Sequence, residues 1–169
     1  DADLLITIGG ASVGDYDLVQ SVMNDEGLAL GFYKIAMRPG KPLIFGQLKN
    51  TPVLGLPGNP VSAGVTSLIF LRAAMDVMLG LDPKAAGDDT AILGEDLDAN
   101  DQRQDYIRAR LVPGETADLV ALPFSRQDSS MMATFSKADC LIVRPAHAAA
   151  VQKGARVKIV RMNFSRIGF

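Results

Sequence analysis

Three short loops in this 169-residue chain carry residue types that bind anions. The first loop is GGASVGDYD, residues 9–17. Its glycines, whose backbone N–H groups can approach an anion closely, are Gly9, Gly10 and Gly14. Ser12 could donate to a phosphate, whereas Asp15 and Asp17 would hold a divalent metal ion or a polar ring of the ligand. The simpler alternative is a tight turn in which an aspartate caps a helix.

The second loop, RPGKP at residues 38–42, is stiff and cationic. Its prolines restrict the backbone, so holding Arg38 and Lys41 in place costs less ordering entropy when an oxyanion binds. Arg38 offers a planar fork to an oxyanion, whereas Lys41 and the preceding Lys34 offer point charges. The alternative is a surface turn whose cations are solvated.

The third loop, LPGNPVS at residues 56–62, lies where a predicted strand ends and a predicted helix begins. Asn59 is suited to the N-cap, and Pro60 to the first helical position, where its missing N–H costs nothing. The first free N–H groups of the helix, near Val61, could form a second anion cradle with the Ser62 hydroxyl. The alternative is a helix start that binds no ligand.

The elements that must position these loops alternate between strand and helix, which predicts an α/β unit. The first, Leu4–Ile8, is continuously apolar, so we expect a strand buried on both faces. The next expected elements are a helix from Asp15 or Asp17 to about Asn24, a strand over about 30–37, and strands over 43–46 and 53–56 joined by a turn at 49–51.

The helix predicted after Asn59 carries apolar residues around nearly its whole circumference, so we expect it to be mostly buried. Gly80 predicts its end, with Pro83 beyond it. Arg72 and Asp76 interrupt this stretch, and we therefore expect no apolar run of the roughly 18 residues that a membrane span needs.

After a linker at 84–87 and a charged stretch over 95–105, the apolar pattern changes to the period of two that strands show. The expected elements are strands at 107–111, 119–122, 140–143 and 156–159, with a short helix near 130–135. So many short strands predict a small β-barrel or sandwich. We therefore expect two domains, an α/β domain over 1–83 and a small β-barrel domain over 84–169.

The composition excludes several classes of protein. With 48% hydrophobic and 21% charged residues the chain is not disordered, and a net charge of −2 argues against a general nucleic-acid binder. The single cysteine, Cys140, excludes an internal disulfide and fits a reducing compartment; its apolar strand predicts a core position. The single histidine, His147, argues against a Ser–His catalytic pair, and we expect it to be a surface or packed residue.

All three loops adjoin strand ends, so we expect them to meet at one rim of a sheet, where open α/β sheets bind ligands. The segments GGASVGDYD, KIAMRPGKP and GLPGNPVS, followed by QDSSMMATFSKADCLIVRP, resemble the molybdopterin molybdenumtransferase family (MoeA and the gephyrin E domain). They occur in the family's order, and the resemblance extends over essentially the whole chain. It implies part of a molybdopterin-binding three-layer α/β domain followed by a small β-barrel domain.

The resemblance also implies the last step of molybdenum cofactor synthesis, in which molybdate enters adenylylated molybdopterin and AMP leaves with the help of Mg²⁺ or Zn²⁺. The residues implied to cradle the pterin phosphate or nucleotide are Gly9, Gly10, Ser12 and Gly14. Those implied to attract and position molybdate are Lys34, Arg38, Lys41 and Ser62. The implied pocket wall consists of Pro57, Gly58, Asn59 and Pro60. Asp17, with Asp15, would orient the ligand, and Asp17 would hold the divalent metal ion.

The resemblance further implies a longer, cytoplasmic parent protein. The chain begins at Asp1 without a signal peptide, and we expect upstream domains that contribute acidic residues, some of them from the partner subunit of a homodimer. The expected partners are the pterin nucleotide and molybdate, with no nucleic acid and no membrane.

Three other functions remain open. A molybdopterin adenylyltransferase shares the pterin-binding fold, but it needs no β-rich appendage. A non-catalytic scaffold or interaction module would use the loops only as structure. An unrelated phosphosugar-type binder would show no selectivity for molybdopterin.

Overall fold

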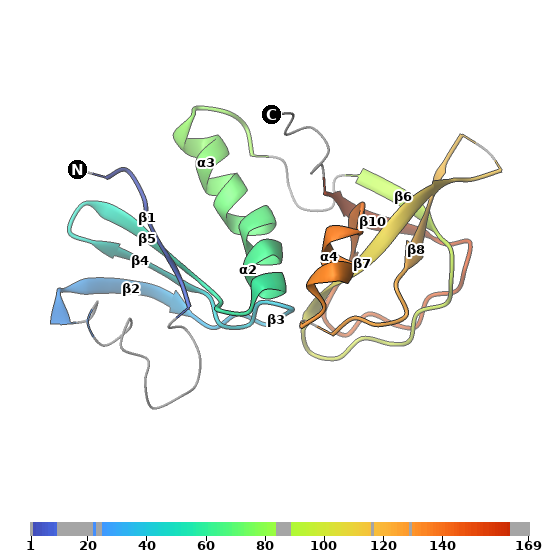
Figure 1. Cartoon of the computed structure of the whole chain (residues 1–169), viewed down its shortest axis with the longest axis horizontal. Coiled ribbons are helices and arrows are strands. Elements are labelled where there is room, and N and C mark those ends of the chain that lie inside the picture. Colours follow the sequence, from blue (N-terminus) through green and yellow to red (C-terminus); the bar gives the residue numbers. More distant parts are fainter. Residues whose placement is uncertain are drawn as a thin grey trace.

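The strands form two sheets, and a long helical segment lies between them (Figure 1). The structure is a computed structural model that describes residues 2–9, 22, 25–83, 89–115, 117–128 and 130–162. The predicted loop residues from Gly10 to Asp17, and all but Val22 of the helix predicted to end near Asn24, lie outside these described residues.

The first sheet has four strands in the order β1-β5-β4-β2. Their bounds are Leu5–Ile8 for β1, Leu28–Tyr33 for β2, Ile44–Leu48 for β4 and Thr51–Leu56 for β5. β1 runs parallel to β5, whereas β4 is antiparallel to both β5 and β2. The predicted hairpin is confirmed, because Lys49 and Asn50 form the turn between β4 and β5.

Two predictions about these strands were wrong in part. β1 is not buried on both faces: Ile6 is 41% exposed and Ile8 is 72% exposed, and as alternate residues of a strand these two side chains share one face. The strand predicted over 30–37 is interrupted, and the two-residue β3 (Met37–Arg38) is separate from β2. Lys34 lies between them with φ of 67°, a left-handed conformation that does not continue a strand.

The helical segment begins as predicted. Asn59 is the N-cap of α2 (Pro60–Thr66), and its Oδ1 accepts a hydrogen bond of 3.0 Å from the Ser62 N–H. A π-helical turn, η1 (Ser67–Leu71), joins α2 to α3 (Arg72–Met78). The helical end predicted near Gly80 is confirmed, since Gly80 has φ of 72°.

Burial of this segment is uneven, contrary to the prediction. Ala63, Phe70 and Leu71 pack against Leu54 and Leu56 of β5. In α3, however, apolar side chains are about half exposed, because the sheet lies under the first part of the helix only: Met75 49%, Val77 59% and Met78 47%.

The segment Pro60–Met78 has 19 residues and is long and apolar enough, by length and composition, to cross a membrane. The expectation that no stretch would meet this criterion was therefore too strict. This criterion considers length and composition only, and 22% of the window is buried, with Ala63, Phe70 and Leu71 packed on the core.

The second sheet closes on itself. Its strands are β6 (Asp89–Leu93), β7 (Gln104–Pro113), β8 (Leu119–Pro123), β9 (Cys140–Arg144) and β10 (Arg156–Arg161). They follow the order β7-β8-β6-β10-β9, and β9 returns to pair with β7, which confirms the predicted β-barrel. The short helix α4 (Met132–Ser136) confirms the helix predicted near 130–135, whereas β6 was not predicted.

The single cysteine lies in the interior of the barrel. Cys140 is fully buried among Ala91, Leu93, Ile142 and Ile159, and burial raises the pKa of its thiol to about 12. It is a core residue, as predicted. His147 is exposed, which is one of the two environments predicted for it.

The two sheets are joined through β3. Met37 and Arg38 lie in the first predicted domain, but β3 pairs in parallel with β7, with Arg38 opposite Asp105. Met37 is buried in a core cluster that also contains Val65 of α2 and Phe135 of α4. The loop that carries the predicted cations is therefore held by both halves of the chain.

Candidate anion-binding rim

The three predicted loops start from the same edge of the four-stranded sheet. β1 and β5 are parallel and end together, since Ile8 lies opposite Leu56. Ile44, at the start of β4, lies opposite Gly55 and opposite Tyr33 at the end of β2. The segments after β1, after β2, before β4 and after β5 therefore share one edge. We call this edge the rim; its described residues are Gly9, 34–43 and 57–62.

The first and third loops are in backbone contact at the rim. The Gly9 N–H donates to the Leu56 carbonyl at 3.0 Å. A Cβ added at Gly58 would lie 3.3 Å from the Cα of Gly9, which is a tight contact, whereas one added at Gly9 would lie 3.8 Å from the Cα of Gly58, an ordinary contact. Gly9 also has φ of 89°, which favours glycine. The other predicted residues of the first loop lie outside the described part of the chain: Gly10, Ser12, Gly14, Asp15 and Asp17.

Two backbone hydrogen bonds close the base of the second loop. The Lys34 N–H donates to the Leu43 carbonyl at 3.1 Å, and the Ile35 N–H donates to the Lys41 carbonyl at 2.9 Å. Lys34 and Lys41 therefore lie on neighbouring backbone segments, and both are exposed. The Lys34 ammonium is 4.6 Å from the centre of the Tyr33 ring, a cation–π distance.

The second loop also rests on α2, close to the third loop. A Cβ at Gly40 would lie 2.5 Å from the Thr66 Cγ2, so only glycine fits against this helix. The Thr66 hydroxyl donates to the Ser62 carbonyl at 2.9 Å, one helical turn nearer the N-terminus. Among the described residues, the structure thus brings Gly9, Lys41 and Ser62 to one rim.

Backbone N–H groups of the third loop are already hydrogen-bonded, which the sequence did not suggest. The Ser62 N–H donates to the Asn59 side chain, and the Ala63 N–H donates to the Asn59 carbonyl at 2.8 Å. These N–H groups were expected to be free for an anion, but the N-cap already uses them. Ser62 itself is only 7% exposed and Pro57 is buried, whereas Gly58 and Pro60 face solvent and Asn59 is half-buried.

The guanidinium of Arg38 is engaged by carboxylates. Its Nη2 donates to the Oδ2 of Asp105, and its Nη1 lies 3.6 Å from the Oδ2 of Asp101. Asp101 also accepts a 2.6 Å hydrogen bond from Arg103, and the hydrogen bonds from Arg103 lower the pKa of Asp101 to about 2. Neither aspartate was predicted as a site residue. Their charged stretch, 95–105, was visible in the sequence, but its pairing with a loop more than 60 residues away was not.

No group of three or more His, Cys, Asp or Glu that could hold a metal ion occurs within the described ranges. Asp17, the predicted ligand of a divalent ion, lies outside them. The described rim therefore supplies cations and backbone, and the metal site remains a prediction about Asp17.

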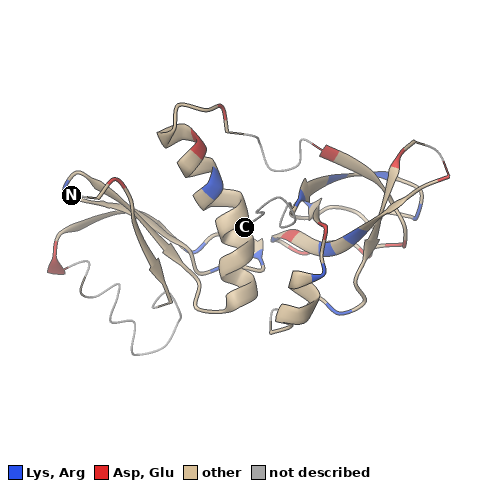
Figure 2. Cartoon of the chain, turned by 45° about the horizontal axis from the view of Figure 1, so that its top comes forward, with Lys and Arg blue, Asp and Glu red and all other residues tan. Residues whose placement is uncertain are grey.

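Charge is distributed unequally between the two sheets (Figure 2). The four strands of the first sheet contain no Lys, Arg, Asp or Glu, whereas acidic and basic residues lie side by side on the barrel. The rim cations thus stand at the end of an uncharged sheet. Their field at the rim is countered there by the two aspartates beside Arg38.

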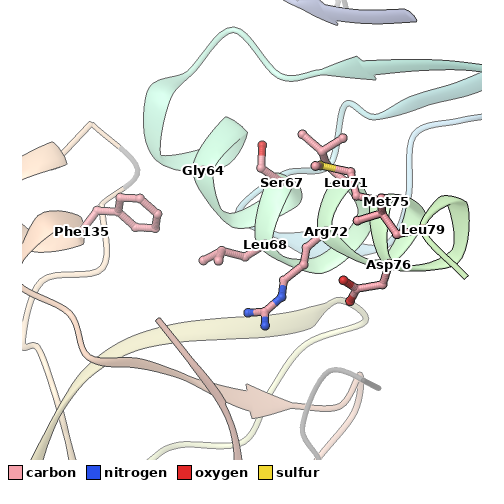
Figure 3. A pocket seen from close by; sticks show the side chains of 9 residues that line it. All are labelled: Gly64, Ser67, Leu68, Leu71, Arg72, Met75, Asp76, Leu79 and Phe135. Atoms are coloured by element: carbon pink, nitrogen blue, oxygen red, sulfur yellow. The ribbon is translucent and has the colours of Figure 1, made fainter. Parts of the chain in front are cut away.

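A pocket of about 340 Å³ lies along the helical segment (Figure 3). Its lining is mostly apolar and consists of Gly64, Ser67, Leu68, Leu71, Arg72, Met75, Asp76, Leu79 and Phe135. Phe135 from α4 closes one end, where a Cβ at Gly64 would lie 2.6 Å from its ring. None of the predicted site residues lines this pocket.

Comparison with known proteins assigns both halves of the chain to molybdopterin proteins. Residues 1–76 match the family described as a probable molybdopterin binding domain. Residues 90–162 match the C-terminal region of MoeA, its domain IV. The sheet with the rim and the closed barrel therefore each correspond to a domain of molybdopterin proteins.

Whole-chain comparisons agree. The chain is 35% identical to the molybdopterin molybdenumtransferase of Haemophilus influenzae, over 96% of this chain and 40% of the relative. It is 34% identical to the Drosophila melanogaster molybdenum cofactor synthesis protein cinnamon, over 85% of this chain and 24% of that protein. The crystal structure of a molybdopterin biosynthesis MoeA protein from Pyrococcus horikoshii superposes with a TM-score of 0.73 at 26% identity, covering 95% of this chain and 37% of that one. The chain belongs to the MoeA/gephyrin family of molybdopterin molybdenumtransferases, and it spans well under half the length of these relatives.

Proposed function

We propose that this chain is part of a transferase of molybdenum cofactor biosynthesis, which inserts molybdate into adenylylated molybdopterin with release of AMP. The observation that carries the proposal is the meeting of Gly9, Lys41 and the Gly58–Ser62 loop at one rim of the domain that matches the molybdopterin-binding family. Substrates with several negative charges suit a rim that presents cations and closely packed glycines.

Molybdate is a dianion, and the rim offers it charge at two exposed ammonium groups. A unit charge about 4 Å from an ammonium gains about 1–4 kcal/mol, depending on how much water separates them. We assign this attraction to Lys34 and Lys41, with Arg38 and Ser62 completing the predicted set. The loop closure between residues 34–35 and 41–43 holds the two lysines on neighbouring backbone segments before the ligand arrives, which lowers the entropy lost on binding.

The pterin nucleotide would occupy the other side of the rim. The residues assigned to it are Gly9, Gly10, Ser12 and Gly14, with a wall of Pro57, Gly58, Asn59 and Pro60. A Mg²⁺ or Zn²⁺ ion at Asp17, supported by Asp15, would polarise the phosphate that is cleaved. The chain's own contribution at the described residues is positioning and electrostatic stabilisation, which needs no nucleophile–base pair. The proposal includes a cytoplasmic homodimer of the longer parent protein.

Direct titration of the chain with molybdate tests the proposal. Lys41→Ala is expected to weaken molybdate affinity about tenfold, because it removes one of the exposed ammonium groups at the rim. Lys49→Ala is the matched control, since Lys49 is an exposed lysine at the opposite end of β4, in the β4–β5 turn. Its affinity for molybdate is expected to equal that of the unmodified chain.

The outcomes separate the alternatives. Binding of both molybdate and molybdopterin, with molybdate binding weakened by Lys41→Ala, supports the transferase. Molybdopterin binding that is insensitive to molybdate would favour an adenylyltransferase. Equal binding of inorganic phosphate and molybdopterin would favour a phosphosugar-type site, and a folded chain that binds none of them would favour a scaffold.

A further inference from the structure

Arg38 sits where the rim loop meets the barrel. Its strand, β3, pairs with β7 so that Arg38 lies opposite Asp105, and the Gln104 N–H donates to the Ala36 carbonyl at 2.9 Å. The side chain of Arg38 is half exposed, whereas that of Asp105 is only 9% exposed. The guanidinium thus reaches from a solvent-exposed loop to a carboxylate that belongs to the barrel.

The carboxylate of Asp105 depends on this contact. Its Oδ2 accepts from the Arg38 Nη2, while its Oδ1 is buried without a hydrogen-bond partner among the described residues. A buried carboxylate is stable only when it is paired, so Asp105 needs a cation at this place. Asp101, at 43% side-chain exposure and 3.6 Å from Arg38, is a secondary partner already bound to Arg103.

We infer that Asp105 is a positioning residue for the rim: it acts through Arg38 to hold the 34–43 loop against the barrel. The inference rests on the proposed function in one respect, that the loop held in this way is the one that binds molybdate. Met37 and Gly40 position the same loop by packing, Met37 in the cluster that includes Val65 and Gly40 against Thr66, but only Arg38 ties it by charge, chiefly through Asp105.

The cations of the loop therefore have two different roles. The charge of Arg38 is largely compensated by Asp105 and Asp101, so its part at the rim is chiefly geometric. Among the described residues, Lys34 and Lys41 have no carboxylate within ion-pair distance, and they therefore provide the uncompensated positive charge. Loss of Asp105 would move the lysines rather than remove their charge.

Asp105→Asn tests the inference in the full 169-residue chain, because it removes the charge and keeps the shape. The lost negative charge would by itself strengthen the attraction for molybdate. We expect the lost position of the loop to outweigh it, so that molybdate affinity, measured by titration, falls about tenfold, the lower end of what losing a residue that orients a ligating group costs. We also expect faster amide hydrogen exchange at Ile35 and Gln104, whose N–H groups close the loop and dock it on the barrel. Asp105→Glu, which keeps the carboxylate, should restore much of both.

Asp89→Asn is the matched control. Asp89 is also an aspartate of the barrel paired with an arginine, Arg161 at 3.1 Å, but it lies away from the rim loop. Exchange at Ile35 and molybdate affinity should both stay as in the unmodified chain. A variant Asp105→Asn that binds molybdate with unchanged affinity and shows unchanged exchange at Ile35 would overturn the inference.

The remaining results are also decisive. If the unmodified chain binds no molybdate, the proposed function fails, and exchange at Ile35 in Asp105→Asn alone judges the positioning role. If Asp105→Asn does not fold, Arg38→Gln replaces it, because that side chain is half exposed. Faster exchange at Ile35 in Arg38→Gln supports the inference, and unchanged exchange overturns it.

Discussion

The open four-stranded sheet and the closed barrel differ in how far they bury their apolar side chains. Every barrel strand has at least two neighbours, and residues such as Ile142 and Ile159 are fully buried inside the barrel. In the open sheet, β1 has one neighbour among the described strands, and Ile8 at its end is 72% exposed. Closure removes the unpaired edge strands of a sheet, whereas an open sheet keeps them.

The open sheet carries the candidate binding site, whereas the closed barrel contributes residues that hold it in place. The candidate site lies at the rim of the open sheet, where strands end and backbone groups are accessible. The barrel contributes Asp105 and Asp101, which face the rim loop from outside the barrel core. The barrel therefore supplies the anchor of the loop, and the open sheet supplies the candidate binding surface.

The largest expected effect is a loss of stability in the barrel core. Ile142→Ala should lower the free energy of unfolding by about 4 kcal/mol, because it leaves a cavity among closely packed side chains. Ile8→Ala should change it by no more than about 0.5 kcal/mol, since that side chain is mostly exposed. Urea unfolding of both variants makes the measurement. Equal losses would show that β1 is covered in solution, and the contrast between the two sheets would fail.

The next contrast compares a glycine at the rim with one on the barrel. Gly40→Ala should cost about 3 kcal/mol, because φ of 111° strains alanine and the new Cβ meets Thr66 at 2.5 Å. Gly154→Ala has φ of 89° but nothing within 4 Å, so it should cost about 1 kcal/mol. Thermal unfolding can compare them. Thr66→Ser removes the clashing methyl group and should recover part of the loss in Gly40→Ala; no recovery would argue against the packing of the loop on α2.

A smaller effect is expected at the start of α2. Asn59→Ala removes the side chain that accepts from the Ser62 N–H and should lower the free energy of unfolding by about 1 kcal/mol. Asn59→Asp keeps an acceptor at the N-cap, so chemical denaturation should find it close to the unmodified chain. A loss as large for the aspartate variant would mean that Asn59 acts by something other than capping.

The smallest expected effect concerns acid stability at the junction of the two sheets. The pKa of Asp101 is about 2, below its ordinary value of 3.8, because Arg103 hydrogen-bonds its carboxylate. A lowered carboxylate pKa stabilises the folded state above the ordinary value, and this contribution is lost as the pH falls from about 4 to about 2. Asp101→Asn and Arg103→Gln should each flatten the dependence of the melting temperature on pH in this range. An unchanged profile in both variants would show that the hydrogen bonds between Arg103 and Asp101 do not contribute to stability in acid.

Local features were predictable because neighbouring residues determine them. The β4–β5 turn, the N-cap at Asn59 and the stop at Gly80 each depend on the conformational preferences of a few adjacent residues, and the structure confirms all three. The barrel strands followed from their alternating pattern in the same way. β6 was missed because its short apolar run, Ala91–Leu93, lies beside polar residues without a clear period.

The exposure of elements was less predictable. A continuous apolar run shows that a segment can be buried, but the number of neighbours it finds depends on the rest of the fold. Ile8 and Met78 are both apolar residues that the pattern placed in the interior, and both are largely exposed. The sequence pattern cannot show whether another layer of the fold will cover an apolar face.

The amino-acid sequence by itself determined the two kinds of sheet, the three loops with their glycines and cations, and the family to which they belong, because periodicity and turn chemistry act over a few residues. Only the tertiary structure decided that Arg38 is held by Asp105 and that Lys34 and Lys41 keep free charge. The physical reason is that a pairing between residues 67 positions apart depends on how two sheets come together, which no local preference encodes.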